Sequence, residues 1–391
     1  MASRFFGVMG RSLLHATLAW HLYDLTGQVI WLGVLGAVEF LPVIPVAFVG
    51  GALADRRDRR DILMLTRAAA VLCAATLFVG TGGATNELWL LLGTAFVLHT
   101  AEGFEFPAAS ALLPTLVPRP IFQNAVFASS AVRNAAFASG PVLAGLAIDA
   151  SGTRAGYAIG AGLMALSLLA LLGIRRPGAS DPGVRVGLES FREGLAFLRR
   201  RPALIAAMSL DMLAVIFADP TVLLAVFQKE ILEVGATGYG ILSGAMAGGT
   251  LIMTLVLLPR RGFERPGRVL VAAVAVFGLA VLLFGLSRWF PLSVAALAVA
   301  GMADQVSQVT RSAIIQLATP DALRGRVSGV NYVFISASNQ FGAAFTGFFA
   351  AATTAVFATV AGAAACLATA AAIGSRVPAL RRYRVDEAPE A

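Results

Sequence analysis

Ionisable side chains lie within long apolar stretches of this 391-residue chain. Six acids and three arginines share this placement: Glu39, Glu102, Glu105, Asp211, Asp219, Asp304, Arg11, Arg133 and Arg311. A charge at the centre of an apolar membrane helix costs about 2.5 to 3.5 kcal/mol, so these groups are expected to face the protein interior or a water-filled cavity. Because the acids outnumber the arginines, some carboxyl groups are expected to lack a cationic partner. Burial disfavours their charged form, which suits them to reversible proton binding.

Glu39 is the first candidate for a proton-binding carboxyl group, because Pro42 and Pro45 lie close to it. Asp211 and Asp304 are the next candidates. For each of these three acids, the alternative is a permanent structural ion pair.

The composition indicates that the solvent of the folded chain is a lipid bilayer. Hydrophobic residues make up 58% of the chain and charged residues 13%, whereas about a quarter of the residues in an average soluble protein are charged. Apolar segments of about 20 residues recur, which is the length that a helix needs to cross a membrane. We expect an all-α membrane protein with twelve transmembrane helices, at 3–24, 30–53, 62–82, 88–110, 122–148, 154–174, 203–228, 238–258, 268–286, 291–317, 326–349 and 353–375.

The distribution of arginine predicts the orientation of these helices. Loops at 56–60, 175–201, 260–268 and 324–326 carry arginine clusters, whereas the opposite loops hold only Arg154, Lys229 and Arg288. Cytoplasmic loops collect Lys and Arg, so both termini are predicted to be cytoplasmic. This explains the pI near 10.4 without a nucleic-acid partner. The first segment lacks a cleavage site and is expected to be retained.

Cysteines and histidines give no sign of a metal centre along the sequence. Cys73 and Cys366 lie within apolar spans and form neither a disulfide framework nor a metal pattern. His15, His21 and His99 show no grouping with metal-ligand spacing. We therefore expect no metal, no cofactor and no catalytic residue, and a membrane-embedded enzyme is disfavoured.

A heavily charged loop separates the second and third spans. It reads Gly51-Ala52-Leu53-Ala54-Asp55-Arg56-Arg57-Asp58-Arg59-Arg60. This loop resembles that of the major facilitator superfamily, Gly-x-Leu-Ala-Asp-Arg-x-Gly-Arg-Lys, with Asp58 in place of Gly. The resemblance implies that Asp55 acts as an inner latch on the eleventh helix. Arg59 or Arg60 is then expected to pair with an acid on the fourth helix, Glu105 first and Glu102 as the alternative. A loop that only keeps this side in the cytoplasm is the other interpretation.

Two further motifs resemble superfamily patterns. Gly140-Pro141-Val142-Leu143-Ala144-Gly145 is similar to the fifth-helix pattern of antiporters, and it predicts a helix bend or else ordinary small-residue packing. His99-Thr100-Ala101-Glu102-Gly103 is similar to the fourth-helix pattern Arg-x-x-Gln-Gly. His99 and Glu102 share a helix face, where they are expected to form a titratable pair. A buried histidine bonded to any nearby acceptor is the alternative.

The chain is predicted to consist of two similar halves. Segments 107–145 and 309–347 align, pairing Ser110 with Ser312 and Gly140 with Gly342. Repeats of six spans are typical of the superfamily. We expect a six-helix half at 1–175, a cytoplasmic linker with an amphipathic helix at 176–202, a second half at 203–375 and a cytoplasmic tail at 376–391. The linker helix is expected to lie in the headgroup region or to be solvated.

Ala318-Thr319-Pro320-Asp321-Ala322-Leu323-Arg324-Gly325-Arg326-Val327 resembles the exporter subgroup that includes siderophore and macrolide exporters. The resemblance implies a monomeric, proton-coupled exporter of small molecules in a bacterial inner membrane. Its partners are the small-molecule substrate, protons and the lipid bilayer. An importer or facilitator of a small metabolite is the alternative. The expected cavity residues are Glu39, Asp211, Asp304, Arg133, His99, Glu102, Asn331 and Asn339. Arg133 is expected either to neutralise an acid or to hold an anionic cargo.

Overall fold

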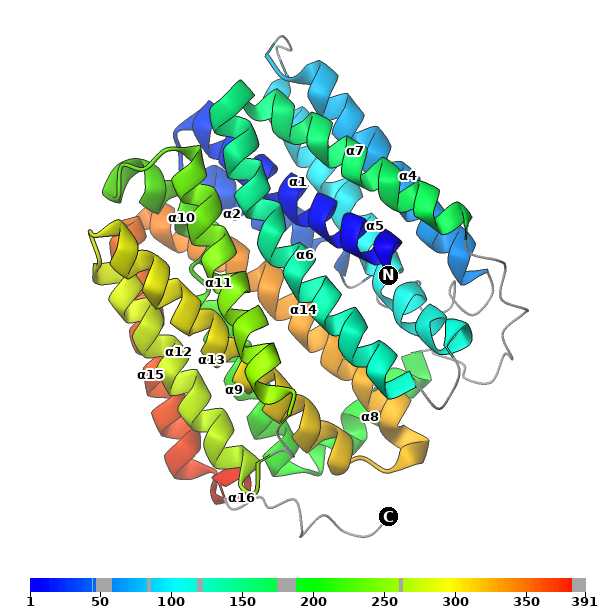
Figure 1. The fold of residues 1–391 in the computed structure, drawn as a ribbon. Coiled ribbons are helices and arrows are strands. Elements are labelled where there is room, and N and C mark those ends of the chain that lie inside the picture. The colour runs from blue at the N-terminus through cyan, green and yellow to red at the C-terminus, as the bar shows by residue number, and fades with distance from the viewer. Residues whose placement is uncertain are drawn as a thin grey trace.

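The computed structural model describes residues 1–43, 45–46, 58–82, 86–117, 122–173, 188–259 and 263–381 of the chain. Figure 1 shows long helices that run side by side, and the described residues include no strand. Eight of the described helices are long and apolar enough to cross a membrane. The all-α membrane fold expected from the sequence is confirmed.

The helices before the linker correspond to the predicted spans, except in the second span. They are α1 (Ala2–Thr26), α2 (Ile30–Phe40), α4 (Arg59–Gly80), α5 (Glu87–Leu116), α6 (Phe122–Ser151) and α7 (Thr153–Leu172). α2 ends at Phe40 within the predicted span 30–53, and residues 47–53 of that span lie outside the described residues. In α4, the side chain of Asp58 accepts a hydrogen bond of 2.9 Å from the backbone N of Arg60. Asp58 is thus the N-cap of α4, where it satisfies one of the free amides at the helix start.

The helices after the linker match the remaining spans. They are α9 (Pro202–Ala218), α11 (Ala236–Leu257), α12 (Pro266–Leu286), α13 (Phe290–Leu317), α14 (Asp321–Ala352) and α15 (Ala355–Arg376), with the short α16 (Pro378–Arg381) after them. After α9 the chain continues through η2 (Thr221–Leu223), α10 (Leu224–Val226) and the π-helical η3 (Phe227–Ile231). The interruption lies at Asp219 and Pro220, where the Asp219 carboxylate accepts bonds from the backbone N and the hydroxyl of Thr221, at 2.9 and 2.7 Å.

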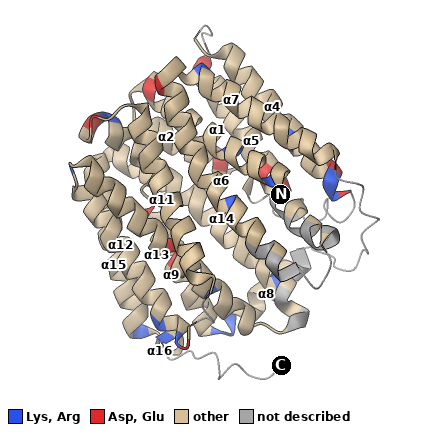
Figure 2. Cartoon of the chain, viewed as in Figure 1, with Lys and Arg blue, Asp and Glu red and all other residues tan. Residues whose placement is uncertain are grey.

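Within each half of the sequence, helices pack in close pairs. α4 packs against α7, and α12 packs against α15. The helices before the linker form the first group and those after it the second group. Contacts between the two groups of helices run chiefly through α6 with α11 and through α2 with α14. Figure 2 shows Lys and Arg gathered around α16 and beside α8, while most of each helix carries no charge.

The predicted linker helix is present as α8 (Leu188–Arg199). It packs against α14 and α9, and Leu198 is buried. The backbone of Arg326 lies against Gly194, and the Arg326 side chain forms an ion pair with Glu193. α8 is therefore attached to the second group of helices. The bounds of the four predicted segments stay a prediction.

Candidate functional site

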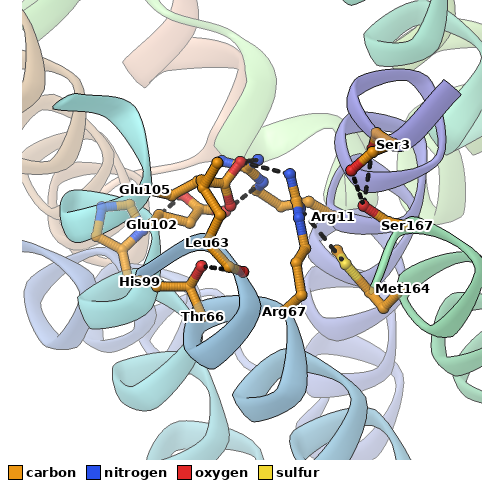
Figure 3. Close-up of polar contacts among 10 residues, drawn as sticks. All are labelled: Ser3, Arg11, Leu63, Thr66, Arg67, His99, Glu102, Glu105, Met164 and Ser167. Atoms are coloured by element: carbon orange, nitrogen blue, oxygen red, sulfur yellow. Dashed lines mark hydrogen bonds and ion pairs between the residues drawn. The ribbon is translucent and has the colours of Figure 1, made fainter. Parts of the chain in front are cut away.

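A buried ion-pair network joins α1, α4 and α5 (Figure 3). Oε1 of Glu105 accepts hydrogen bonds from Nη2 of Arg11 at 2.7 Å and from Nη2 of Arg67 at 2.5 Å. Nε of Arg11 lies 3.3 Å from Oε1 of Glu102. Glu105 and Arg67 are buried, so each charge depends on its partners for the stabilisation that water no longer provides.

The prediction that Arg59 or Arg60 pairs with Glu105 or Glu102 is wrong for Arg60 and stays a prediction for Arg59. Arg60 instead donates to the backbone oxygens of Leu171 and Leu172, both at 3.1 Å. These carbonyl groups lie at the end of α7, where the negative end of the helix dipole favours a cation, and the Leu171 oxygen also accepts from the backbone N of Gly173. Arg67 pairs with Glu105 instead. A charged residue inside the otherwise apolar third span was the sequence feature that could have predicted this pairing.

The remaining latch residues are only partly described. Arg59 is the first residue of α4. Gly51, Asp55 and Arg56 lie outside the described residues. The proposed latch on the eleventh helix therefore stays a prediction.

Two histidines and an acid form a second cluster, beside the ion-pair network. Nε2 of His15 on α1 lies 3.1 Å from Oε1 of Glu39 on α2. The rings of His15 and His99 meet edge to face, with centroids 6.2 Å apart. One potential ligand atom from each of His15, Glu39 and His99 lies within 4.8 Å of the other two.

The expectation that the histidines form no group is therefore wrong for two of the three. His15, Glu39 and His99 come from three helices, so their proximity depends on helix packing and leaves no spacing pattern in the sequence. His21 lies elsewhere, with Nδ1 2.8 Å from the hydroxyl of Tyr157 and Nε2 3.1 Å from Glu87. The predicted pair of His99 and Glu102 is present, with Nδ1 and Oε2 3.6 Å apart.

A cavity of about 180 Å³ adjoins this cluster. Its walls come from α5, from α14 and from the residues that follow α2. The lining consists of Pro42, Val43, Val46, His99, Glu102, Gly103, Tyr332, Ser336, Asn339 and Gln340. Hydroxyl, amide, imidazole and carboxylate groups thus share a space with aliphatic side chains, which is the usual mixture in a small-molecule site. Tyr332, Ser336 and Gln340 were not predicted.

The carboxylates of the second group of helices differ in their partners. Asp211 on α9 forms a buried ion pair with Arg311 on α13 and accepts a hydrogen bond of 3.3 Å from Ser307. Oδ2 of Asp304 accepts a hydrogen bond of 3.0 Å from the amide of Gln308. No Lys or Arg among the described residues pairs with Asp304. Both acids line a small cavity of about 10 Å³.

The other predicted cavity residues are dispersed. Asn339 is exposed and lines the larger cavity. Asn331, two turns earlier on α14, has a buried Oδ1 that accepts no hydrogen bond from the described chain. Arg133 on α6 is exposed, and neither Asn331 nor Arg133 lines the larger cavity.

The glycine motif of α6 is a site of close helix contact. Gly140 lies against Ser12 and Leu13 of α1, whereas Gly145 lies against Ala236 and Gly240 of α11. The backbone O of Pro141 also faces Gly240. A side chain at these glycines would meet the backbone of another helix, so the small residues permit the contact.

Polar contacts join the two groups of helices at the end of the bundle where α1 finishes. Asp149 accepts hydrogen bonds from the backbone N atoms of Ala236 and Thr237, at 3.0 and 2.8 Å. Lys229 pairs with Asp24 at 2.7 Å, and the Tyr23 hydroxyl donates to Glu230. Asp149 thus caps the start of α11 from a neighbouring helix, at the end where the helix dipole favours an anion.

Comparisons with known proteins identify the family of this chain. Residues 1–339 match the family model of the Major Facilitator Superfamily. The chain is 25% identical to the enterobactin exporter EntS of Escherichia coli O1:K1 over 353 residues, which is 88% of this chain and 83% of that protein. It is 32% identical to the uncharacterized MFS-type transporter YfiS of Bacillus subtilis over 173 residues, which is 43% of this chain but only 40% of that protein.

Solved structures show the same fold. A POT family transporter in complex with 5-aminolevulinic acid superposes with a TM-score of 0.75 at 13% identity, covering 97% of this chain and 96% of that one. The nucleoside transporter NupG superposes with a TM-score of 0.73 at 16% identity, covering 96% and 98%. From the fold, the cavity and these matches, the chain belongs to the Major Facilitator Superfamily of membrane transporters.

Proposed function

We propose that this transporter exports a small polar organic molecule in exchange for protons, with both termini in the cytoplasm of a bacterial cell and the chain acting as a monomer in the inner membrane. The observation that carries the proposal is the cavity between α5 and α14, which combines walls from both groups of helices. In alternating access, a site between two halves is exposed first on one side and then on the other. The resemblance to EntS supports export as the direction.

The cavity favours a cargo with several hydrogen-bonding groups. Tyr332, Ser336, Asn339 and Gln340 supply hydroxyl and amide groups from α14, and Glu102 supplies a carboxylate from α5. The Glu102 charge lies beside Arg11 at 3.3 Å, so part of it is already neutralised within the protein. A neutral polar molecule therefore suits this space better than a strongly charged one.

Asp304, in place of the first sequence candidate Glu39, is the carboxyl group that we assign to the coupling proton, because Glu39 has His15 as a partner at 3.1 Å. Asp211 has Arg311 as a partner, and Glu105 has two arginines, so these acids are stabilised as permanent anions. The bond from Gln308 to Asp304 is a contact with a neutral group. An acid in a membrane helix without a cationic partner is stabilised by binding a proton, and it releases that proton when water reaches it.

Contacts between the helix groups support an inward-facing state. With the predicted orientation, Asp149, Tyr23 and Lys229 lie at the outer end of the bundle and hold it closed. Such a state receives cargo from the cytoplasm, as an exporter requires.

Accumulation measurements test the function. The chain is expressed in a bacterial strain that lacks its own efflux pumps, and cells are loaded with catecholate siderophores, macrolides or cationic dyes. Export predicts lower accumulation of at least one class than in cells with an empty vector, and a protonophore should abolish the difference. Higher accumulation would instead identify an importer, and unchanged levels of all three classes would contradict export of these molecules.

A further inference from the structure

We propose that His15, Glu39 and His99 bind one late first-row divalent metal ion, such as Zn²⁺ or Co²⁺. The three side chains extend from α1, α2 and α5 toward a common point, and one potential ligand atom from each lies within 4.8 Å of the others. The proposal does not depend on transport or on its direction.

The donor set fits this class of ion. Imidazole nitrogen suits Zn²⁺ and its neighbours in the series, and two histidines with one carboxylate form a known type of zinc site with an open fourth position. Two of the three helices are fixed by buried neighbours of the ligands. Leu13 and Leu14 on α1 and Leu35 on α2 are buried. The ligands on these two helices therefore come from a rigid scaffold.

The distances require only a small adjustment. Ligand atoms around a tetrahedral zinc ion lie about 3.3 Å apart, given bonds of about 2.0 to 2.2 Å. His15 Nε2 and Glu39 Oε1 already lie at 3.1 Å. The third ligand atom lies within 4.8 Å of the other two, so it must move closer by at most about 1.5 Å. Rotation of the histidine side chain can supply a movement of this size.

Two carboxylates, Glu39 and Glu102, lie at the cluster, and the nearby Arg11 pairs with Glu102 at 3.3 Å. Among the described residues, the charged or chargeable group that pairs with the buried Glu39 is His15, with no Lys or Arg beside it. A divalent ion would compensate the negative charge of Glu39. Glu102 lies 3.6 Å from Nδ1 of His99, which is beyond hydrogen-bond distance.

An ion can reach the site. The His15 side chain is 40% exposed, and His99 lines the cavity of about 180 Å³. The open coordination position is available to water or to a donor atom of a molecule in the cavity.

Cobalt titration of the full-length protein in detergent tests the proposal. The protein carries a histidine-free affinity tag and is first treated with a chelator. We expect one Co²⁺ per chain with the visible bands of a four-coordinate ion, and Zn²⁺ should displace it. His15→Gln, Glu39→Gln and His99→Gln should each weaken Co²⁺ binding at least about tenfold.

His21→Gln is the matched control. His21 also lies on α1, is buried and contacts a glutamate, but it belongs to no three-ligand group among the described residues. Its substitution should leave Co²⁺ affinity unchanged. Thermal unfolding of each variant distinguishes loss of the site from loss of the fold. His15→Gln is expected to disturb the fold least, because the His15 side chain is the most exposed of the three. Absence of the visible bands, or equal affinity in all four variants, would overturn the proposal.

Discussion

Arg311 and Asp211 form a buried ion pair that joins α13 to α9, with side chains that are 5% and 7% exposed. Removing one partner leaves the other charge buried without compensation, which costs about 3 to 5 kcal/mol. We therefore expect Arg311→Met to lower the unfolding temperature strongly in detergent. The double variant Arg311→Met with Asp211→Leu should recover most of the loss, since it removes both charges. A double variant as unstable as the single one would show that packing matters more than charge at this pair.

Asp304→Asn should separate proton coupling from binding. An asparagine keeps the size of the side chain but cannot bind and release a proton. In proteoliposomes, we expect the variant to lose transport driven by a pH gradient while it retains exchange of cargo down a concentration gradient. Glu264→Gln, an exposed change in the loop before α12, is the control and should keep both activities. Wild-type pH-driven transport in Asp304→Asn would contradict the assignment.

Asp149→Ala should shift the transporter toward an outward-open state. The substitution removes two hydrogen bonds to the start of α11, and loss of such a cap costs about 1 kcal/mol, or roughly a fivefold change in population. The readout is labelling of Asn339→Cys by an impermeant maleimide added to intact cells, with the buried Cys73 and Cys366 replaced by Ala.

Faster labelling in Asp149→Ala than in the unmodified background is expected. Asp61→Ala provides the control, because Asp61 is an exposed acid in the first turn of α4. Slower or equal labelling in the Asp149 variant would count against closure at this end of the bundle.

Gly145→Ala should disturb the contact between α6 and α11. A Cβ at Gly145 would meet the backbone O of Ala236 and lie 3.0 Å from Cα of Gly240. Overpacking of this kind costs about 1 to 3 kcal/mol. The measurement is the fraction of protein that stays monodisperse on size exclusion after heating. Gly248→Ala is the matched control, since a Cβ there meets nothing within 4 Å. Equal heat resistance of the two variants would refute the packing argument.

The helices themselves were largely predictable from the sequence. The predicted span 122–148 corresponds to α6, and the predicted linker helix corresponds to α8. These predictions succeed because a membrane helix is defined by its own length and apolarity. The break after α9 was missed, although Asp219-Pro220 is a recognisable signal for the end of a helix.

The pairing of charged side chains was not predictable in the same way. Arginines occur at several positions of α1 and α4. Which of them faces Glu105 depends on how each helix is rotated about its axis. Arg67 and Arg60 are only two helical turns apart, yet one binds Glu105 and the other binds the end of α7. The meeting of His15 with Glu39 and His99 likewise requires three helices to be packed correctly, so the sequence alone did not indicate it.

His15, Glu39 and His99 all come from helices that precede the linker. If this group moves as one body, a bound metal ion has the same affinity in the inward-facing and outward-facing states. A ligand with equal affinity for two states does not change their ratio. The ion would then stabilise the packing of α1, α2 and α5 equally in both states. It would influence the transport cycle only if a cargo atom completed its coordination.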